Sequence, residues 1–297
     1  MKKFTSAAVL VAMITAMISL MCCHAFAASE TVCDTIPTSS SEVQKCINAA
    51  GDAVPCIIRI NKEIIVTGSS INVPAGKNII IRSESKKGVL STTYGSFRRN
   101  SSLTDKALFT VASGATLTFR NANTDKDFEI LGSQTSSVVK STMPAIHTKG
   151  TVVFEKNCLL RRCFLDSETA TGAGILVNGG KLIVSGSTIS NCTSYSSAGG
   201  AISVINGGSA ELNSVTIKSC SAIKGSSIYY STGSLTLGGE TSFDNIVYAA
   251  KPIILKSDFS SETPIKLTFP NYTINREVLN FSEGFDYDGL FTTVGTG

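Results

Sequence analysis

A recurring unit of short strand, glycine turn and short strand constrains the fold of this chain more than any other feature. One unit reads GILV, then GG, then LIV within residues 174–184, and the next reads AISV, then GG, then AEL within residues 201–212. A third short strand follows in several units, and the pattern returns every 26 to 29 residues. The equivalent isoleucines of successive units are Ile146, Ile175, Ile202 and Ile228.

Each of these strands alternates apolar with small or polar residues, which is the two-residue period of a strand with one buried face. Three short strands per unit can form one turn of a wide coil, and stacked coils bury their inward side chains against each other. We therefore expect an all-β fold, a single-stranded right-handed parallel β-helix, with the four isoleucines in one inward column. A β-sandwich would show hairpin turns and no fixed period. A leucine-rich repeat would show helical return segments.

The step from Leu108 to Ile146 is longer than the period and indicates an insertion. Residues 84–106 and 121–143 are rich in Ser, Thr and Lys. We expect both segments to be loops that leave the coil, with a strand at residues 128–130 inside the second one.

Three cysteines end the same four-residue phrase of successive units, and we expect them to stack at one corner of the coil: Cys163, Cys192 and Cys220. A column of buried thiols is the favoured interpretation. A disulfide between adjacent coils is an open alternative, because the spacing of neighbouring strands lies within the range that a disulfide tolerates. A metal or redox site is less favoured, since no histidine or acid recurs beside the cysteines. We expect no metal and no cofactor.

The two ends of the coil have a different pattern. Within residues 41–50, apolar residues fall at helical spacing after a run of serines, which predicts a short amphipathic helix closing the first coil. We assign residues 28–56 to this N-terminal cap, 57–250 to the β-helix, and 251–297 to terminal coils and a closing segment. Three cysteines cluster around the cap, and a disulfide among them is an open alternative: Cys33, Cys46 and Cys56.

The first residues have the layout of a secretory signal peptide: two lysines, an apolar run over residues 7–23, and a small-x-small site. We expect residues 1–27 to be removed by cleavage between Ala27 and Ala28. An uncleaved anchor and a lipoprotein are the alternatives. The expected location is therefore secreted or at the cell surface, with a membrane involved only through export or an unknown attachment.

The charge and the acids restrict the function. The formal net charge is +4 with no basic stripe, so nucleic acid is not an expected partner. A glycoside hydrolase needs two carboxylates across the scissile bond, and only Glu211 and Glu240 are separated by about one coil. A calcium-dependent lyase would need a cluster of oxygen ligands, and the sequence has no Asp-rich cluster. We name no catalytic residue, and we expect His147 to be a surface strand residue.

Binding is the alternative to catalysis. The loops that follow the cysteine corner differ most between units, and variable loops on a rigid stack commonly carry ligand contacts. A glycan or a protein of a host or cell surface is the expected partner, and a spacer without a ligand is a third possibility. The favoured contact residues in these loops are Asp166, Glu168, Tyr195 and Lys224.

Short motifs add a family resemblance. Residues 199–202 read GGAI, as in the repeats of polymorphic outer-membrane proteins. Residues 189–192 and 217–220 lie where those repeats carry FxxN, but they have Ile in place of Phe and Cys in place of Asn. The opening, residues 43–81, resembles pectate-lyase-like β-helix proteins and adhesin-like proteins. The resemblance implies an adhesin-like binding or structural module without an evident catalytic site. Polysaccharide lyases and glycoside hydrolases share the fold and are the alternative.

Overall fold

The computed structural model describes residues 30–85, 94–123, 126–134, 136–270, 279–280 and 289–294. The predicted signal peptide and its cleavage position between Ala27 and Ala28 lie outside these residues. Within the described part of the chain, no helix is both long and apolar enough to span a bilayer.

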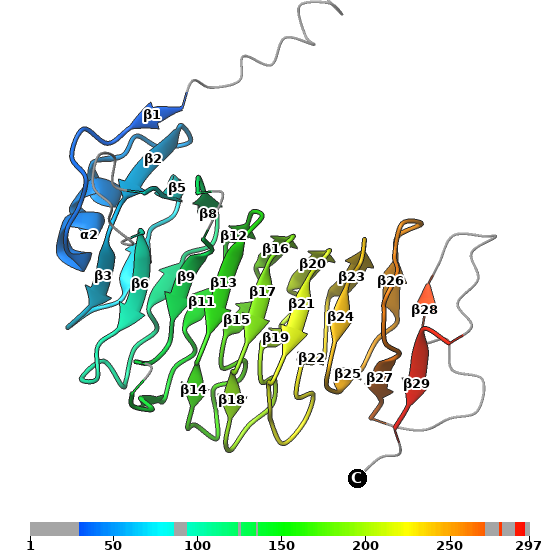
Figure 1. Cartoon of the computed structure of the whole chain (residues 1–297). Helices are drawn as coiled ribbons and strands as arrows, with labels where there is room; N and C mark the ends of the chain where they lie inside the picture. The colour runs from blue at the N-terminus through cyan, green and yellow to red at the C-terminus, as the bar shows by residue number, and fades with distance from the viewer. Residues whose placement is uncertain are drawn as a thin grey trace, which may run out of the picture.

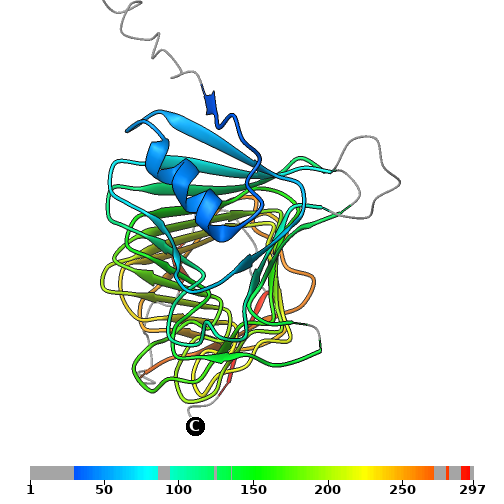
Figure 2. The ribbon, with the colours of Figure 1, turned by 90° about the vertical axis from the view of Figure 1, so that its left-hand side faces the viewer.

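The described chain winds into a parallel β-helix, which confirms the predicted fold class. Its strands form three long parallel sheets that run along the molecule, and each sheet receives one short strand from most coils (Figure 1). Viewed from the N-terminal end, the strands enclose a common interior and the only helix of the described residues, α2, lies across that end (Figure 2).

Among the described residues, the first sheet has ten strands. In spatial order it contains β1 (Thr31–Val32), β2 (Pro55–Ile60), β5 (Asn78–Ser83), β8 (Thr116–Asn121), β12 (Thr151–Phe154), β16 (Lys181–Ser185), β20 (Ser209–Asn213), β23 (Ser234–Gly238), β26 (Ile253–Leu255) and β28 (Leu279–Asn280).

Of the strands described, seven form a second sheet and nine a third. The second contains β3 (Glu63–Val66), β6 (Ser96–Arg99), β9 (Phe128–Leu131), β13 (Cys158–Arg161), β17 (Thr188–Ser190), β21 (Thr216–Lys218) and β24 (Ser242–Phe243). The third contains β4 (Ile71–Val73), β7 (Phe109–Val111), β11 (Ile146–Thr148), β15 (Ile175–Asn178), β19 (Ile202–Ile205), β22 (Ile228–Tyr230), β25 (Val247–Ala249), β27 (Ile265–Thr268) and β29 (Phe291–Thr293).

The interior is built from columns of like residues in direct register. Ile146 pairs with Ile175, Ile175 with Ile202, and Ile202 with Ile228, and all four side chains have no exposed surface. The column continues to Phe109, which pairs with Ile146. The predicted equivalence of Leu108 with Ile146 is therefore wrong by one residue.

The corners of the coil place the backbone in the left-handed region at matching positions of successive coils. At the corner between the first and second sheets, φ is 60° at Asn157, 55° at Gly186, 53° at Ser214 and 56° at Gly239. Asn and Gly tolerate this region best. The recurring turn residues of the sequence thus mark where each coil changes direction.

The cap helix α2 (Ser40–Ala49) begins at Ser39, whose hydroxyl accepts a hydrogen bond from the Glu42 backbone N–H. The carboxylate of Glu42 in turn accepts hydrogen bonds from the backbone and side chain of Thr38. Val43 and Ile47 are fully buried on its inner face. The helix contacts β2, β3 and β4, so it closes the first coil as the spacing of its apolar residues predicts.

The segment 84–106 differs from its prediction as a loop. It contains β6, a full member of the second sheet, which pairs with β3 and β9. The predicted strand at residues 128–130 is confirmed as β9. Past residue 250, β26 and β27 continue the first and third sheets. Much of the predicted closing segment lies outside the described residues.

Candidate functional site

The loops after the cysteine corner stack on each other and form a long edge. Their first residues form a small parallel ladder of β10 (Lys140–Ser141), β14 (Phe164–Leu165) and β18 (Thr193–Ser194). Single bridges extend the ladder from Thr193 to Ser221 and from Ala198 to Lys224. We call residues 140–142, 164–172, 193–199 and 221–226 the loop edge. Because its backbone is paired, the loop edge holds its side chains at the repeat distance of a sheet.

Two of the predicted contact residues meet on this edge. The Asp166 N–H donates to the Ser141 carbonyl at 2.8 Å, and the Tyr195 N–H donates to the Leu165 carbonyl at 2.9 Å, so the two residues occupy equivalent places. The Lys140 ammonium links them, with Nζ 3.2 Å from Asp166 Oδ2 and 4.2 Å from the centroid of the Tyr195 ring. The Tyr195 side chain keeps 42 % of its surface exposed.

The other two predicted contact residues lie apart from this cluster. Lys224 Nζ lies 4.3 Å from the centroid of the Tyr248 ring, which stacks on Tyr229 at 5.1 Å and an interplanar angle of 13°. Glu168 is exposed in the Asp166 loop, and its carboxylate makes no ion pair or side-chain hydrogen bond to the described residues. The sequence prediction missed Lys140, Tyr229 and Tyr248. The pair of Lys224 with Tyr248 could not be predicted without the register of β22 with β25, which places Tyr248 opposite Tyr229.

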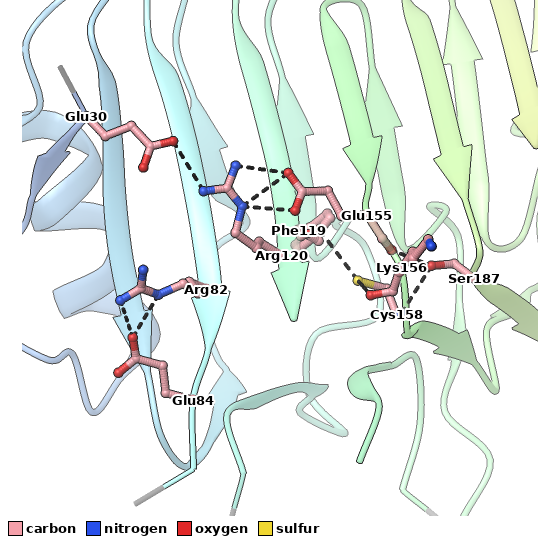
Figure 3. A network of polar contacts seen from close by, with 9 residues as sticks. All are labelled: Glu30, Arg82, Glu84, Phe119, Arg120, Glu155, Lys156, Cys158 and Ser187. Carbon is pink, nitrogen blue, oxygen red and sulfur yellow. Dashed lines mark hydrogen bonds and ion pairs between the residues drawn. The ribbon is translucent and has the colours of Figure 1, made fainter. Parts of the chain in front are cut away.

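Several acids outside the loop edge are paired with basic side chains. Figure 3 shows Arg120 between two acids, with its guanidinium 2.9 Å from Glu155 and 3.2 Å from Glu30. Hydrogen bonding to Glu155 is the largest cause that raises the pKa of Arg120. In β5, the strand next to β8, Arg82 pairs with Glu84, which follows two residues later in the chain. These carboxylates form ion pairs with arginines of the first sheet.

Two further acids of the sheets, Glu129 and Glu211, are paired with basic side chains. Arg161 lies 2.8 Å from Glu129, and Lys256 pairs with Glu211. Glu211 lies opposite Thr236 in the first sheet, while Glu240 forms a bridge with Ser260 at a corner. The two acids that the spacing singled out therefore occupy different places in their coils, and they do not face each other as a hydrolase pair would.

His147 lines a shallow hollow of about 270 Å³ on the outer face of the third sheet. The wall is formed by β4, β7 and β11 with the turns that follow, including Asn72, Thr110 and Lys149. Burial is the main cause that lowers the pKa of His147, and the nearby Lys149 adds to it. The imidazole is thus neutral near pH 7, and no carboxylate lines the hollow among the residues described.

The three column cysteines occupy one corner of successive coils. Each follows a residue in the left-handed region, and each thiol donates to the carbonyl two residues before it: at 3.6 Å for Cys163, 3.3 Å for Cys192 and 3.3 Å for Cys220. Like the other cysteines of the described residues, all three are free thiols. Burial, followed by hydrogen bonds with the two neighbouring cysteines, raises the pKa of Cys192 well above its usual value. Among the described residues, no group of three or more His, Cys, Asp or Glu side chains is placed to hold a metal ion.

Comparison of the chain with protein families, curated proteins and solved structures finds no match. The likeness to polymorphic outer-membrane and adhesin-like repeats therefore remains a resemblance of short motifs on a parallel β-helix.

Proposed function

We propose that the protein is exported and acts at the cell surface or in the surroundings as an adhesin-like β-helix module that binds a glycan or a surface protein through its loop edge. The proposal takes the polysaccharide-degrading enzymes of this fold as the alternative. Fold alone does not choose between these functions, so the choice depends on the side chains of the site.

The observation that carries the proposal is the cluster of Asp166, Lys140 and Tyr195 on the paired loop edge. It combines an exposed aromatic ring with one acidic and one basic group on a rigid backbone. Aromatic and charged side chains that are held in place lose little conformational entropy on binding, and they are frequent in recognition surfaces. Lys224 of the loop edge forms a second basic and aromatic pair with Tyr248, a buried residue of β25 in the third sheet.

The pairing of the carboxylates also favours a binding function over a glycosidase. A retaining or inverting glycosidase needs one carboxylate as acid and another as nucleophile or base, both facing the substrate. Each of Glu129 in β9, Glu155 directly after β12 and Glu211 in β20 is paired with Arg or Lys. In each of these three pairs the carboxylate faces a basic side chain and not a second carboxylate, which a glycosidase would place across the substrate.

The test combines location and binding. Culture medium, washed cells and lysate are separated, and the protein is expected in the first two fractions with an N-terminus at Ala28. The purified protein is then applied to an array of glycans and extracellular matrix proteins. Tyr195→Ala and Lys224→Ala are expected to weaken binding to a captured ligand by roughly tenfold or more, as is typical of a central contact residue.

Lys181→Ala is the matched control for Lys224→Ala, because Lys181 is an exposed lysine of β16, on the outer face of the first sheet and outside the loop edge. It should bind like the unaltered protein. An equal loss of ligand binding in Lys181→Ala and Lys224→Ala would argue against the loop edge as the binding surface. Release of oligosaccharides from a polyuronate by the purified protein would favour the enzyme alternative.

A further inference from the structure

The N-terminal arm is held to the β-helix by few backbone contacts. β1 pairs with β2 through only two residues, Thr31 opposite Cys56 and Val32 opposite Ile57. One further hydrogen bond joins the Cys33 N–H to the Ile57 carbonyl at 2.9 Å. The chain then leaves the sheet and continues to α2. A two-residue strand at the edge of a sheet is a weak attachment.

A pair of sulfur atoms lies where this arm leaves the sheet. Cys33 Sγ is 2.7 Å from Cys46 Sγ on the inner face of α2, which places the two atoms in direct contact. Thr35 Oγ1 lies beside both, 3.7 Å from Cys33 Sγ and 3.8 Å from Cys46 Sγ. The third cysteine of the cap, Cys56, makes no such sulfur contact with either of them among the described side chains.

We propose that Cys33 and Cys46 form a disulfide that fastens the N-terminal arm to the cap helix. The proposal rests on the proposed export only for its oxidant, a protein disulfide or a small-molecule disulfide of an extracytoplasmic compartment. The remaining cysteines that the structure describes stay reduced.

The reaction is two steps of thiol–disulfide exchange. The Cys33 thiolate attacks one sulfur of the external disulfide, so that a mixed disulfide forms and one external thiolate leaves. The Cys46 sulfur then attacks Cys33 Sγ, and the second external thiolate leaves. The protons of the two cysteine thiols pass to the two departing thiolates, and the external disulfide is reduced by two electrons.

The environment of each sulfur suits its part in this sequence. Cys33 is partly exposed, and an external disulfide can reach it. Burial raises the pKa of Cys33, but hydrogen bonds from Cys46 and Thr35 outweigh this effect and lower the pKa overall. Burial, together with the hydrogen bond to Cys33, raises the pKa of Cys46 to about 11. Cys33 is therefore the first nucleophile and Cys46 the second.

The column cysteines contrast with this pair. Cys163, Cys192 and Cys220 are buried in the coil corner and each thiol is directed to a carbonyl of its own turn. An external disulfide cannot reach them without local unfolding. The same export thus yields one oxidised pair and a reduced column.

The test is peptide mapping of the purified full chain after equilibration with glutathione disulfide, so that it does not depend on where the cell places the protein. The chain is denatured without reductant, alkylated, and cut with trypsin and an Asp-specific protease. Trypsin cuts before Cys46, and cleavage before Asp34 and Asp52 separates the three cap cysteines. The expected product joins a peptide ending at Cys33 to the peptide 46–51, and is lighter by two hydrogen atoms than the reduced pair.

Three serine variants complete the test. Cys33→Ser and Cys46→Ser should each abolish the linked product, which also excludes Cys22 or Cys23 as the source of the sulfur. Cys56→Ser is the matched control and should retain it. A reductant should lower the thermal midpoint of the unaltered protein to that of Cys33→Ser and leave that variant unchanged. Alkylation of both Cys33 and Cys46 in the oxidised sample, or a link from Cys33 to Cys56, would overturn the proposal even if the variants fail to fold.

Discussion

At the scale of single residues, the buried thiols are groups whose ionisation must differ strongly between the folded and the unfolded chain. Burial is the main cause that raises the pKa of Cys192, and it raises the pKa of Cys158 to about 12. In the unfolded chain a thiol ionises near pH 8.5. Above that pH the native state therefore holds more protons than the unfolded state, and stability must fall as the pH rises.

We expect the free energy of unfolding, measured by urea titration in the presence of a reductant, to decrease from about pH 8.5 upward. Each thiol that stays protonated when folded contributes about 1.4 kcal/mol per pH unit to this decrease. Cys192→Ala removes one such group, so its slope between pH 9 and 10 should be shallower by about that amount. Other titrating groups are common to both proteins and cancel in the comparison. Identical slopes would mean that the Cys192 thiol ionises in the folded state.

Arg99 shows what sequence reasoning misses at this scale. It faces inward from β6, is only 2 % exposed, and donates from one guanidinium nitrogen to the carbonyls of Leu103 and Lys106 and to the hydroxyl of Ser141. Burial lowers its pKa to about 10. The polar composition of residues 84–106 predicted a loop, and an inward arginine adds no apolar residue that would mark β6 as a strand. Leu103 and Lys106 follow Arg99 closely in the chain, but the Ser141 hydroxyl and the Pro144 carbonyl are 42 and 45 residues away, and sequence alone does not bring them to Arg99.

At the scale of elements, the cap helix protects the end of the third sheet through one side chain. β4 is the terminal strand of that sheet, and its outer edge would leave backbone groups unpaired. The Gln44 amide replaces the missing strand: its oxygen accepts from the Asn72 N–H at 2.7 Å, and its nitrogen donates to the Asn72 carbonyl at 2.9 Å. The helix therefore closes the coil both by burying apolar residues and by pairing a strand edge.

Gln44→Ala should destabilise the protein by about 1–3 kcal/mol, because two backbone groups of Asn72 lose their partner. Self-association should also increase, since an unpaired edge strand is a template for another chain. Lys45→Ala is the control, because Lys45 is exposed on the same helix and the substitution ends in the same residue. Urea unfolding and light scattering give the two readouts. Equal stability of both variants would show that the amide pairing adds nothing to the apolar contacts of α2.

The sequence predicted the existence and the buried face of this helix, because Val43 and Ile47 lie at helical spacing after serine caps. It could not predict the role of Gln44, which depends on where β4 ends in space. The residues of the loop edge were likewise only partly predictable from the sequence. Asp166 and Tyr195 could be predicted because they lie in the variable loops. Lys140, which contacts both, lies in the insertion between Leu108 and Ile146, where the repeat gives no guide.

At the scale of the molecule, the repeat of short strand, glycine turn and short strand every 26 to 29 residues was sufficient to predict the coil and its inward column. The reason is physical: each coil contacts mainly the coils before and after it, so a residue's environment is fixed by its place in the repeat. Register failed only at the edge of the insertion, where Phe109 and not Leu108 pairs with Ile146. There the interior is filled by phenylalanines, such as Phe109 and Phe119 with ring centroids 5.1 Å apart, and the isoleucine pattern no longer guides the alignment.

Removal of one whole coil tests this architecture most directly. Lys181 lies opposite Ser209 in adjacent strands of the first sheet, so deletion of residues 181–208 joins two equivalent points of the helix. Ile175 should then pair with Ile228, and Leu160 with Ile217, with every column intact. We expect a soluble protein with an unchanged β-type circular dichroism spectrum per residue and a moderately lower thermal midpoint, since one set of coil interfaces is lost. Deletion of residues 181–194 is the control: it removes β16, β17 and β18, joins Gly180 to Tyr195 of the loop edge, and moves later strands off their sheets. That variant should aggregate, because a disrupted register exposes apolar faces. Aggregation of the whole-coil deletion, with the half-coil deletion no worse, would contradict a stack held together by neighbouring coils.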